Sequence, residues 1–158
     1  MNFAGLTVRN VLQVDTNDVA TGVYMFNCTN ISLENFVVHN IGGRGFHSIN
    51  CDELFFINCD AYECCDSLNY AAGPGNNGMG FHSHSGNDAT NLSVYYYGCR
   101  AWHCSDQGFA TTNEGLTQYD SCWTWANTGY YFFPNGPPGW DGGFGGGTGF
   151  KGGFMNTQ

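Results

Sequence analysis

The stretch GFHS at residues 45–48 recurs unchanged at residues 80–83, and this repeat decides the predicted fold. The glycine–phenylalanine pair returns as Gly108-Phe109 and Gly149-Phe150, and a weaker copy, Gly22-Val23, comes first. Neighbouring copies are separated by roughly 23 to 41 residues, and about 23 residues is a typical length for one coil of a solenoid. The repeat therefore predicts a chain that winds as stacked coils.

A second marker runs in step with the first one. A short run that alternates apolar and polar residues opens at Leu6, Ile31, Leu54, Leu92 and Leu116. Such alternation is typical of strands, and the repeats are too short to hold both a strand and a full helix. A propeller blade would need roughly 40–45 residues per repeat. We therefore predict an all-β fold, a right-handed parallel β-helix of about five coils.

Two segments interrupt the repeat, at about residues 69–78 and 134–148. Both are rich in glycine and proline, and the first also in asparagine, which indicates loops inserted between strands. Residues 1–158 then form a single β-helix domain. Because the repeat pattern reaches both ends and a solenoid needs caps, we expect a segment of a longer β-helix.

Charge and composition exclude two classes of partner. The net charge is −9, with 4 lysines and arginines against 13 acidic residues, so no basic stripe for nucleic acid is present. No apolar run approaches the ~20 residues of a membrane-spanning helix. The N-terminal residues also lack the basic and apolar regions of a signal peptide.

Equivalent residues of stacked coils form columns, with neighbouring side chains about 4.8 Å apart. The residue after each glycine gives an inward column of Val23, Phe46, Phe81, Phe109 and Phe150. A second inward column from another strand consists of Val11, Phe36, Cys59, Cys99 and Cys122. Three residues further along, a third column contains Val14, His39, Tyr62, Trp102 and Trp125. The two tryptophans of this column are predicted to stack in the core, or alternatively against sugars.

Seven of the eight cysteines fall on three levels of the stack. One level has Cys28 and Cys51, the second is the Cys59 column, and the third has Cys64 and Cys104. We expect a reduced ladder, because cysteine behaves as a small buried hydrophobic residue. A Cys64–Cys104 disulfide is one alternative. A metal site from Cys64, Cys65, Cys104 and His103 is another, although its spacing matches no zinc pattern.

The outward column next to the phenylalanines carries the candidate chemistry. Side chains alternate along a strand, so this column reads Tyr24, His47, His82, Ala110 and Lys151. Lys151 is the only lysine of the chain, and Arg44 precedes the strand of His47. The column is either a solvated face or a binding site, since loops on a rigid scaffold commonly carry function.

Several blocks resemble a known family over roughly residues 45–153. The most specific are CRAWHCSDQGF at residues 99–109 and GTGFK at residues 147–151. NCDAYECCDSLNY precedes them and SCWTWANTGY lies between them, in the same order. The chain resembles the family 9 polysaccharide lyases, which are pectate-lyase-like β-helices. Members of that family cleave acidic polysaccharides by β-elimination, using Ca²⁺ and a lysine base.

The resemblance implies roles for individual residues. The lysine base of the family falls on Lys151, and one of its calcium aspartates falls on Asp106. The other three calcium aspartates fall on Met79, Gln107 and Ala110, so only Asp106 and Gln107 keep a side-chain oxygen. Ca²⁺ takes about 6–8 oxygen ligands, so this departure weakens the predicted calcium site. Nearby loops offer the further candidates Asp66, Asn76, Asn77 and Glu114.

The first functional hypothesis is a Ca²⁺-dependent lyase that acts on an acidic polysaccharide. Lys151 would remove the proton, and a cation would neutralise the uronate carboxylate. His47, His82 and Arg100 would bind the substrate. Arg100 has a structural alternative, an ion pair with Asp60 or Asp120 on an adjacent coil.

The second hypothesis is a non-catalytic β-helix that binds carbohydrate or has a structural role. The missing calcium aspartates and the acidic net charge favour it. Open strand edges invite end-to-end or lateral packing into homo-oligomers or filaments. Under either hypothesis we expect a secreted or cell-surface protein.

Overall fold

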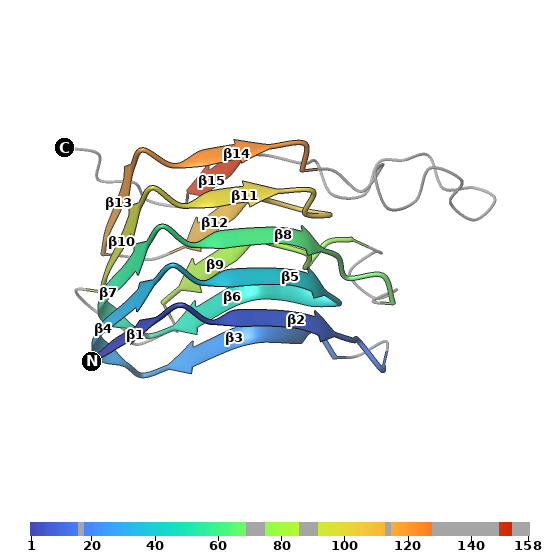
Figure 1. Ribbon diagram of the computed structural model, residues 1–158, viewed down its shortest axis with the longest axis horizontal. Helices are drawn as coiled ribbons and strands as arrows, with labels where there is room; N and C mark the ends of the chain where they lie inside the picture. Colours follow the sequence, from blue (N-terminus) through green and yellow to red (C-terminus); the bar gives the residue numbers. More distant parts are fainter. Residues whose placement is uncertain (16–17, 69–74, 86–91, 113–114, 128–148, 153–158) are drawn as a thin grey trace.

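The computed structural model describes residues 1–15, 18–68, 75–85, 92–112, 115–127 and 149–152. Its regular structure in these ranges is entirely β, and the strands wind as coils stacked one above the other (Figure 1). The predicted loop at residues 134–148, and residues 69–74 of the other loop, lie outside the described residues.

Each of the five coils contributes three strands. The first coil contains β1 (Asn2–Ala4), β2 (Thr7–Val11) and β3 (Ala20–Phe26). The second contains β4 (Thr29–Glu34), β5 (Val37–Ile41) and β6 (Gly43–Ile49). The third contains β7 (Asp52–Ile57), β8 (Asp60–Cys64) and β9 (Phe81–His84). The fourth contains β10 (Ser93–Tyr97), β11 (Arg100–Trp102) and β12 (Phe109–Thr112). The fifth contains β13 (Leu116–Asp120), β14 (Trp123–Trp125) and β15 (Phe150–Gly152).

The strands form three parallel sheets of five strands each. Sheet A has the order β1-β4-β7-β10-β13, sheet B has β14-β11-β8-β5-β2, and sheet C has β15-β12-β9-β6-β3. Every strand pairs with the equivalent strand of the next coil, so the predicted parallel β-helix of five coils is confirmed.

The corner between sheets A and B divides what the sequence presents as one alternating run. Asn35 and Asn58 occupy this corner with φ angles of 54° and 50°, in the left-handed region. Their backbone amides donate to Ile57 O and Tyr97 O of the next coil at 2.9 and 2.8 Å. Asparagine tolerates this conformation better than most residues, so a single asparagine ends one strand and allows the next to begin.

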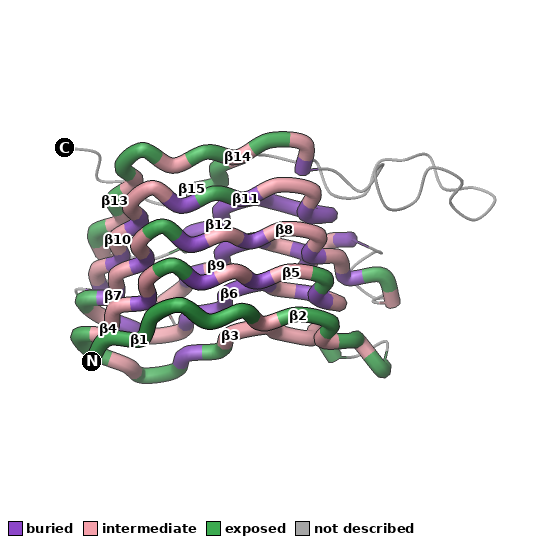
Figure 2. Tube along the Cα trace, viewed as in Figure 1, coloured by how far each residue is buried: buried purple, intermediate pink, exposed green. Residues whose placement is uncertain are grey.

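The phenylalanine column of sheet C is the centre of the core, as predicted. Phe46, Phe81 and Phe109 are at most 1% exposed and lie in one register. Their ring centroids are 4.7 and 4.8 Å apart in parallel stacks, and Phe150 continues the stack at 4.9 Å. Figure 2 shows that buried positions follow one another from coil to coil along the inside of the stack.

The glycine of each glycine–phenylalanine pair is required by close packing. A Cβ atom on Gly80 would lie 2.7 Å from the carbonyl oxygen of Gly108 and 2.9 Å from the Cβ atom of Ala101. A Cβ atom on Gly45 would meet Gly80 O at 2.6 Å and Ala61 Cβ at 3.2 Å. The missing side chains allow sheet C to approach sheet B closely, which explains the repeat of the glycine.

Two predicted columns contain the wrong residue in the first coil, because Leu6 was aligned with Ile31 and Leu54. Val11 pairs with Ile41 rather than Phe36, and Arg9 takes the position beside His39 that was predicted for Val14. Val14 follows β2 and is 84% exposed. The cause is that Leu6 lies just before a strand of sheet B, whereas Ile31 belongs to sheet A.

The leucine marker also fails in the later coils. Leu54 pairs with Val94, and Leu116 pairs with Ser93, so neither Leu92 nor Leu116 aligns with Leu54. Ile31 and Leu54 do pair, as predicted. The glycine of sheet C is required by close packing, but a leucine at this position is not. The leucine therefore does not recur at the same place in every coil.

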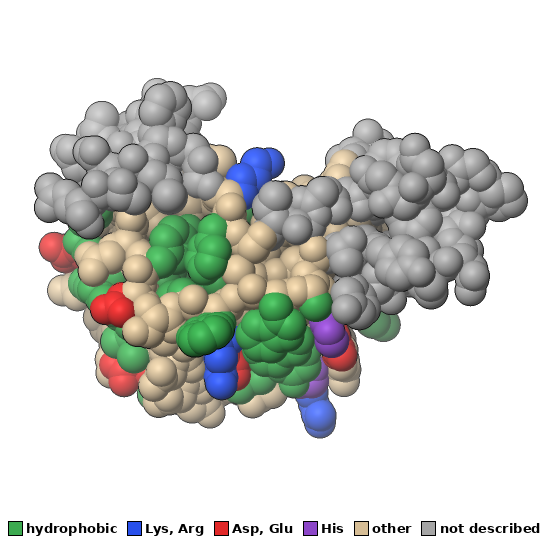
Figure 3. Space-filling model, turned by 90° about the horizontal axis from the view of Figure 1, so that it is seen from above, with side chains coloured by type: hydrophobic (Ala, Val, Ile, Leu, Met, Phe, Trp, Pro, Cys, Tyr) green, Lys and Arg blue, Asp and Glu red, His purple; other side chains and the backbone are tan. Residues whose placement is uncertain are grey.

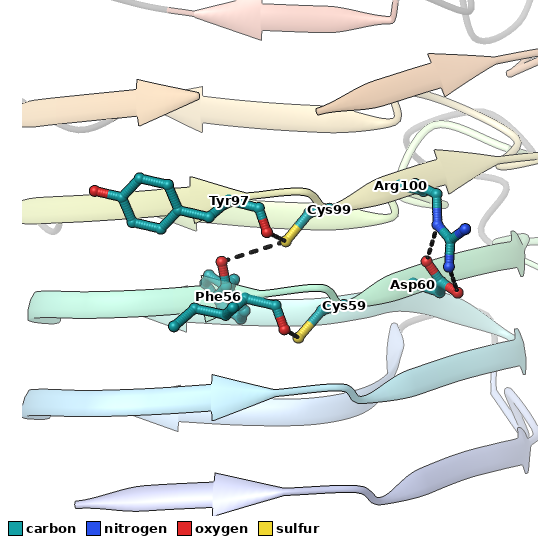
Figure 4. Close-up of polar contacts among 7 residues, drawn as sticks. Phe56, Cys59, Asp60, Tyr97, Cys99 and Arg100 are labelled. Carbon is teal, nitrogen blue, oxygen red and sulfur yellow. Dashed lines mark hydrogen bonds and ion pairs between the residues drawn. The ribbon is translucent and has the colours of Figure 1, made fainter. Parts of the chain in front are cut away.

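The cysteines form the predicted reduced ladder, and all eight are free. The thiol of Cys59 donates to Leu33 O at 3.2 Å. The thiol of Cys99 donates to Phe56 O at 3.4 Å (Figure 4). Cys64 and Cys104 are both buried and are not joined by a disulfide, so the alternative Cys64–Cys104 bridge is not formed. The described residues contain no cluster of three histidine, cysteine or acidic side chains suited to a metal, so the alternative metal site is not formed.

Candidate functional site

The predicted outward column lies on sheet C in the expected order. Tyr24 pairs with His47, His47 with His82, His82 with Ala110, and Ala110 with Lys151. The column is more enclosed than a solvated face would be, because His47 is only 6% exposed and Ala110 only 3%. Lys151, at its upper end, is exposed.

Three histidines pack together on this face. The rings of His47 and His82 stack with centroids 4.9 Å apart and an interplanar angle of 1°. His84, two residues beyond His82 on the same face of β9, lies 5.3 Å from His47 and 5.1 Å from His82. The sequence analysis did not single out His84, although the strand alternation that predicted His82 also applies to it.

Arg44 joins the histidines because the strand is irregular at Gly45. The amides of Gly45 and Phe46, which are consecutive, donate to Met79 O and Gly80 O of the next coil, both at 2.9 Å. In a regular parallel strand the donors to one neighbour alternate, so two consecutive donors show that the backbone departs from regular strand geometry here and that the alternation of side chains is interrupted. The Arg44 side chain consequently lies near His47 and His82, close enough to lower their pKa values.

A polar network holds Arg44 in position. Arg44 Nη2 donates to Asn77 Oδ1 at 3.1 Å, and Asn77 Nδ2 donates to Asp66 Oδ2 at 2.9 Å. Asp66 is fully buried, and its other carboxylate oxygen accepts a bond from Gln13 Nε2 at 2.6 Å. The network connects residues from the first three coils, so the arginine is anchored by the scaffold.

Asp106 and Gln107 lie together in the turn between β11 and β12. They are 5% and 6% exposed, and Gln107 Nε2 donates to Asp106 Oδ1. The amide of Asp106 donates to Gly78 O at 3.1 Å, which ties this turn to the end of the first loop. Lys151 and Arg44 both lie near enough to influence the Asp106 carboxylate.

What we call the sheet C cluster consists of Arg44, His47, His82, Asp106 and Gln107. Burial shifts the pKa values of its titratable groups. Burial raises the pKa of Asp106 to about 7, although Lys151 and Arg44 oppose the shift. Burial, aided by Arg44, lowers the pKa of His47 to about 3 and that of His82 to about 2. Near neutral pH both histidines are therefore uncharged, and Asp106 is protonated in a substantial part of the molecules.

Unpartnered polar atoms are concentrated in this cluster. Among the described residues, the buried side-chain atoms without a hydrogen-bond partner are His39 Nδ1, Arg44 Nε, His47 Nε2, His82 Nδ1 and Gln107 Oε1. Four of these five belong to the sheet C cluster. A buried polar atom without a partner is destabilising, and such a concentration on one face is typical of a site that binds a polar ligand.

The described residues do not fit a calcium ion. Calcium prefers several carboxylate oxygens. Asp106 has Gln107 bonded to it, and the two carboxylate oxygens of Asp66 already accept hydrogen bonds from Gln13 and Asn77. Two cations, Arg44 and Lys151, lie near the same carboxylate. In the ranges that the structure describes, no group of three or more histidine, cysteine or acidic side chains is arranged to hold a metal.

Arg100 does not join the other predicted substrate-binding residues. It lies on β11 of sheet B, and its Nε and Nη2 atoms bind the two carboxylate oxygens of Asp60, each at 2.7 Å (Figure 4). This bond raises the pKa of Arg100. Arg100 and Asp60 line an open groove of about 480 Å³ with Asn35, Val37, Asn58, Gly98, Ser121 and Trp123.

Sheet B also carries an outer ladder of rings. His39 and Tyr62 are 4.7 Å apart, Tyr62 and Trp102 are 4.4 Å apart, and Trp102 and Trp125 are 4.9 Å apart. Viewed down the stack, hydrophobic side chains lie in register along the outside (Figure 3). The prediction that these tryptophans stack on each other is confirmed, but outside the core. Their faces cover one another, so only the end of the ladder has an uncovered face.

Comparison with protein families gives one match. The family model described as "Pel9A-like, right handed beta helix region" matches residues 1–158. The chain belongs to this family. The family description confirms the predicted pectate-lyase-like β-helix and its right-handed winding. For this Pel9A-like chain, neither the search of curated proteins nor that of solved structures gave a match. The described residues form no helix that is long and apolar enough to cross a membrane.

Proposed function

We propose that the outer face of sheet C binds an acidic polysaccharide and that Lys151 acts as the base that cleaves it by β-elimination. One observation carries this proposal. The single lysine of the chain stands in register with two stacked histidines, beside a buried cluster that has four unpartnered polar atoms. Membership of the Pel9A-like family supports the same chemistry.

The reaction needs a base and a positive charge close to each other. The amine of Lys151 takes the proton on the carbon next to the uronate carboxylate, and the released electron pair forms a carbon–carbon double bond. The bond from the neighbouring carbon to the glycosidic oxygen breaks, and that oxygen leaves with its electron pair and is then protonated. Positive charge beside the carboxylate stabilises the carbanion-like state.

The histidines serve binding in this proposal. His47 and His82 are uncharged near neutral pH, because burial lowers the pKa of each. A neutral imidazole has one donor and one acceptor nitrogen, which suits sugar hydroxyl groups. The unpartnered His47 Nε2 and His82 Nδ1 atoms are the ones we assign to these hydroxyls.

The test is an assay on polygalacturonate that follows the ultraviolet absorbance of the unsaturated product. We expect wild-type protein to produce it and Lys151→Ala protein to produce none while still binding the polymer. Absence of both cleavage and binding in the wild type would overturn the proposal.

A second candidate is a binding protein without catalysis. The observation that favours it is that Asp106 is the one aspartate left at the four positions where the family resemblance implies calcium aspartates. It predicts that wild type and Lys151→Ala bind polygalacturonate and that neither releases an unsaturated product. The assay above therefore separates the two candidates.

A further inference from the structure

We propose that Arg44 binds the uronate carboxylate and takes the part of a metal cation, so that the site operates without calcium. This inference rests on the proposed function, because it assigns the group that recognises the acidic sugar. It starts from the disagreement described above, in which the cluster contains cations where a calcium site requires carboxylates.

The guanidinium of Arg44 is held ready for a ligand. Its Nη2 atom is bonded to Asn77, which is fixed by the fully buried Asp66. A group anchored in this way loses little conformational freedom when it binds, and such preorganisation favours affinity. The anchoring partner is a neutral amide, so the positive charge of Arg44 is not neutralised by that bond.

One hydrogen-bond donor of Arg44 has no partner among the described residues. Its Nε atom is buried and has no hydrogen-bond partner. A guanidinium presents its donors in a planar fork that matches a carboxylate. The neighbouring His47 is 94% buried, and its Nε2 atom also lacks a partner, which marks the same place independently.

The charges facing this place favour an anion. Arg44 and Lys151 are the cations near Asp106, and the acidic groups that face Arg44 are Asp66 and Asp106. Asp66 is bonded to Asn77 and Gln13, whereas Asp106 accepts a proton readily because it is buried. When Asp106 is protonated, the remaining acidic group that faces Arg44 is Asp66, which is already bonded to Asn77 and Gln13, so Arg44 can attract a sugar carboxylate.

The first test needs no variant. Binding of polygalacturonate to wild-type protein is measured by calorimetry in buffer with EDTA and again with added CaCl₂. We expect the same dissociation constant in both, and the same rate of cleavage. Binding that appears only with CaCl₂ would overturn the role of Arg44 but leave the proposed function intact.

The second test removes the charge of Arg44 with the variant Arg44→Gln. We expect the dissociation constant for polygalacturonate to rise by about tenfold or more, since a charge-assisted hydrogen bond is lost. The matched control is Arg9→Gln, which makes the same change of charge at an exposed position on sheet B and should leave binding unchanged.

Thermal melting checks that Arg44→Gln protein is folded. If it is not folded, the EDTA experiment on wild-type protein still tests the inference. Equal affinities of folded Arg44→Gln and wild type would overturn the inference, as would an equal loss in Arg9→Gln. If wild-type protein binds polygalacturonate in neither buffer, the proposed function fails and the inference fails with it.

Discussion

The outer faces of sheets B and C are built on the same five coils with the same spacing, yet they differ in what they leave available. On sheet B the rings of His39, Tyr62, Trp102 and Trp125 cover one another. On sheet C, buried nitrogen and oxygen atoms lack partners around His47 and His82. A solenoid can thus repeat the same backbone on every face while only one face keeps a concentration of unpartnered polar groups.

Two arginines show the same contrast. Arg100 on sheet B is 52% exposed and gives two hydrogen bonds to one carboxylate of the neighbouring coil. Arg44 beside sheet C is partly buried, bonds to a neutral amide and keeps its Nε atom unpartnered. Arg100 is bonded within the scaffold, whereas Arg44 keeps one donor without a partner in the described part of the chain, which is the atom that our proposal assigns to a ligand.

The largest expected effect concerns Lys151, the proposed base on sheet C. Lys151→Arg keeps a long basic side chain but replaces the amine, which accepts a proton when uncharged, by a guanidinium, which stays protonated in proteins. We expect the rate of polygalacturonate cleavage to fall by roughly 10²–10⁴-fold, with little change in binding. Cleavage at the wild-type rate would show that Lys151 is not the base.

The next effect separates the inner ladder from the outer one. Phe81→Ala removes a fully buried ring between two stacked neighbours and should lower the free energy of unfolding by about 3–5 kcal/mol. Trp125→Ala, at the 46% exposed end of the outer ladder, should cost only about 1 kcal/mol. Denaturant unfolding of both variants measures this difference, and equal losses would contradict it.

A smaller effect depends on pH and on Asp106. The pKa of this carboxyl is raised from 3.8 to about 7 by burial, so ionisation is unfavourable in the folded state. Below about pH 3 the group is protonated in most folded and unfolded chains alike, and the penalty is nearly absent. As the pH rises from about 4 to about 7, the unfolded chain ionises first and the wild type loses stability.

Asp106→Asn removes this dependence. Its free energy of unfolding should exceed that of the wild type at pH 8 by on the order of 2 kcal/mol, and the difference should approach zero only below about pH 3. Thermal or denaturant unfolding at several pH values measures it. A difference that does not change with pH would show that Asp106 titrates normally.

The smallest effect is expected at the ion pair of sheet B. Asp60→Asn removes the bond to the half-exposed Arg100. Such surface pairs contribute about 0.2–1 kcal/mol, and added salt should reduce the difference from the wild type. Polygalacturonate binding should not change, and a large loss of binding would mean that the groove on sheet B takes part.

Residues that the packing constrains were predicted well. The glycine–phenylalanine pairs predicted the register of sheet C from Val23 to Phe150, because a Cβ atom at the glycine positions would clash with the neighbouring coil. The third sheet was missed, because the left-handed corners at Asn35 and Asn58 look like polar members of an alternating run. Counting from Leu6 then displaced Val11 and Val14 by the same error.

The candidate site was predicted in part for a related reason. The alternation of side chains gave His47, His82 and Lys151 their common face. It could not place Arg44, because the backbone irregularity at Gly45 interrupts the alternation between Arg44 and His47. It also could not show that Arg100 is held by Asp60, since the sequence allowed a second partner, Asp120.

The histidines allow the most direct test of where the polysaccharide binds. The chain has five, of which His47, His82 and His84 lie on sheet C, while His39 and His103 belong to sheet B and the turn after it. NMR spectra of the imidazole groups are recorded while an oligogalacturonate is added. Our account predicts that the resonances of the three sheet C histidines move and that those of His39 and His103 stay. Movement of His39 and His103 alone, or of none of the five, would contradict it.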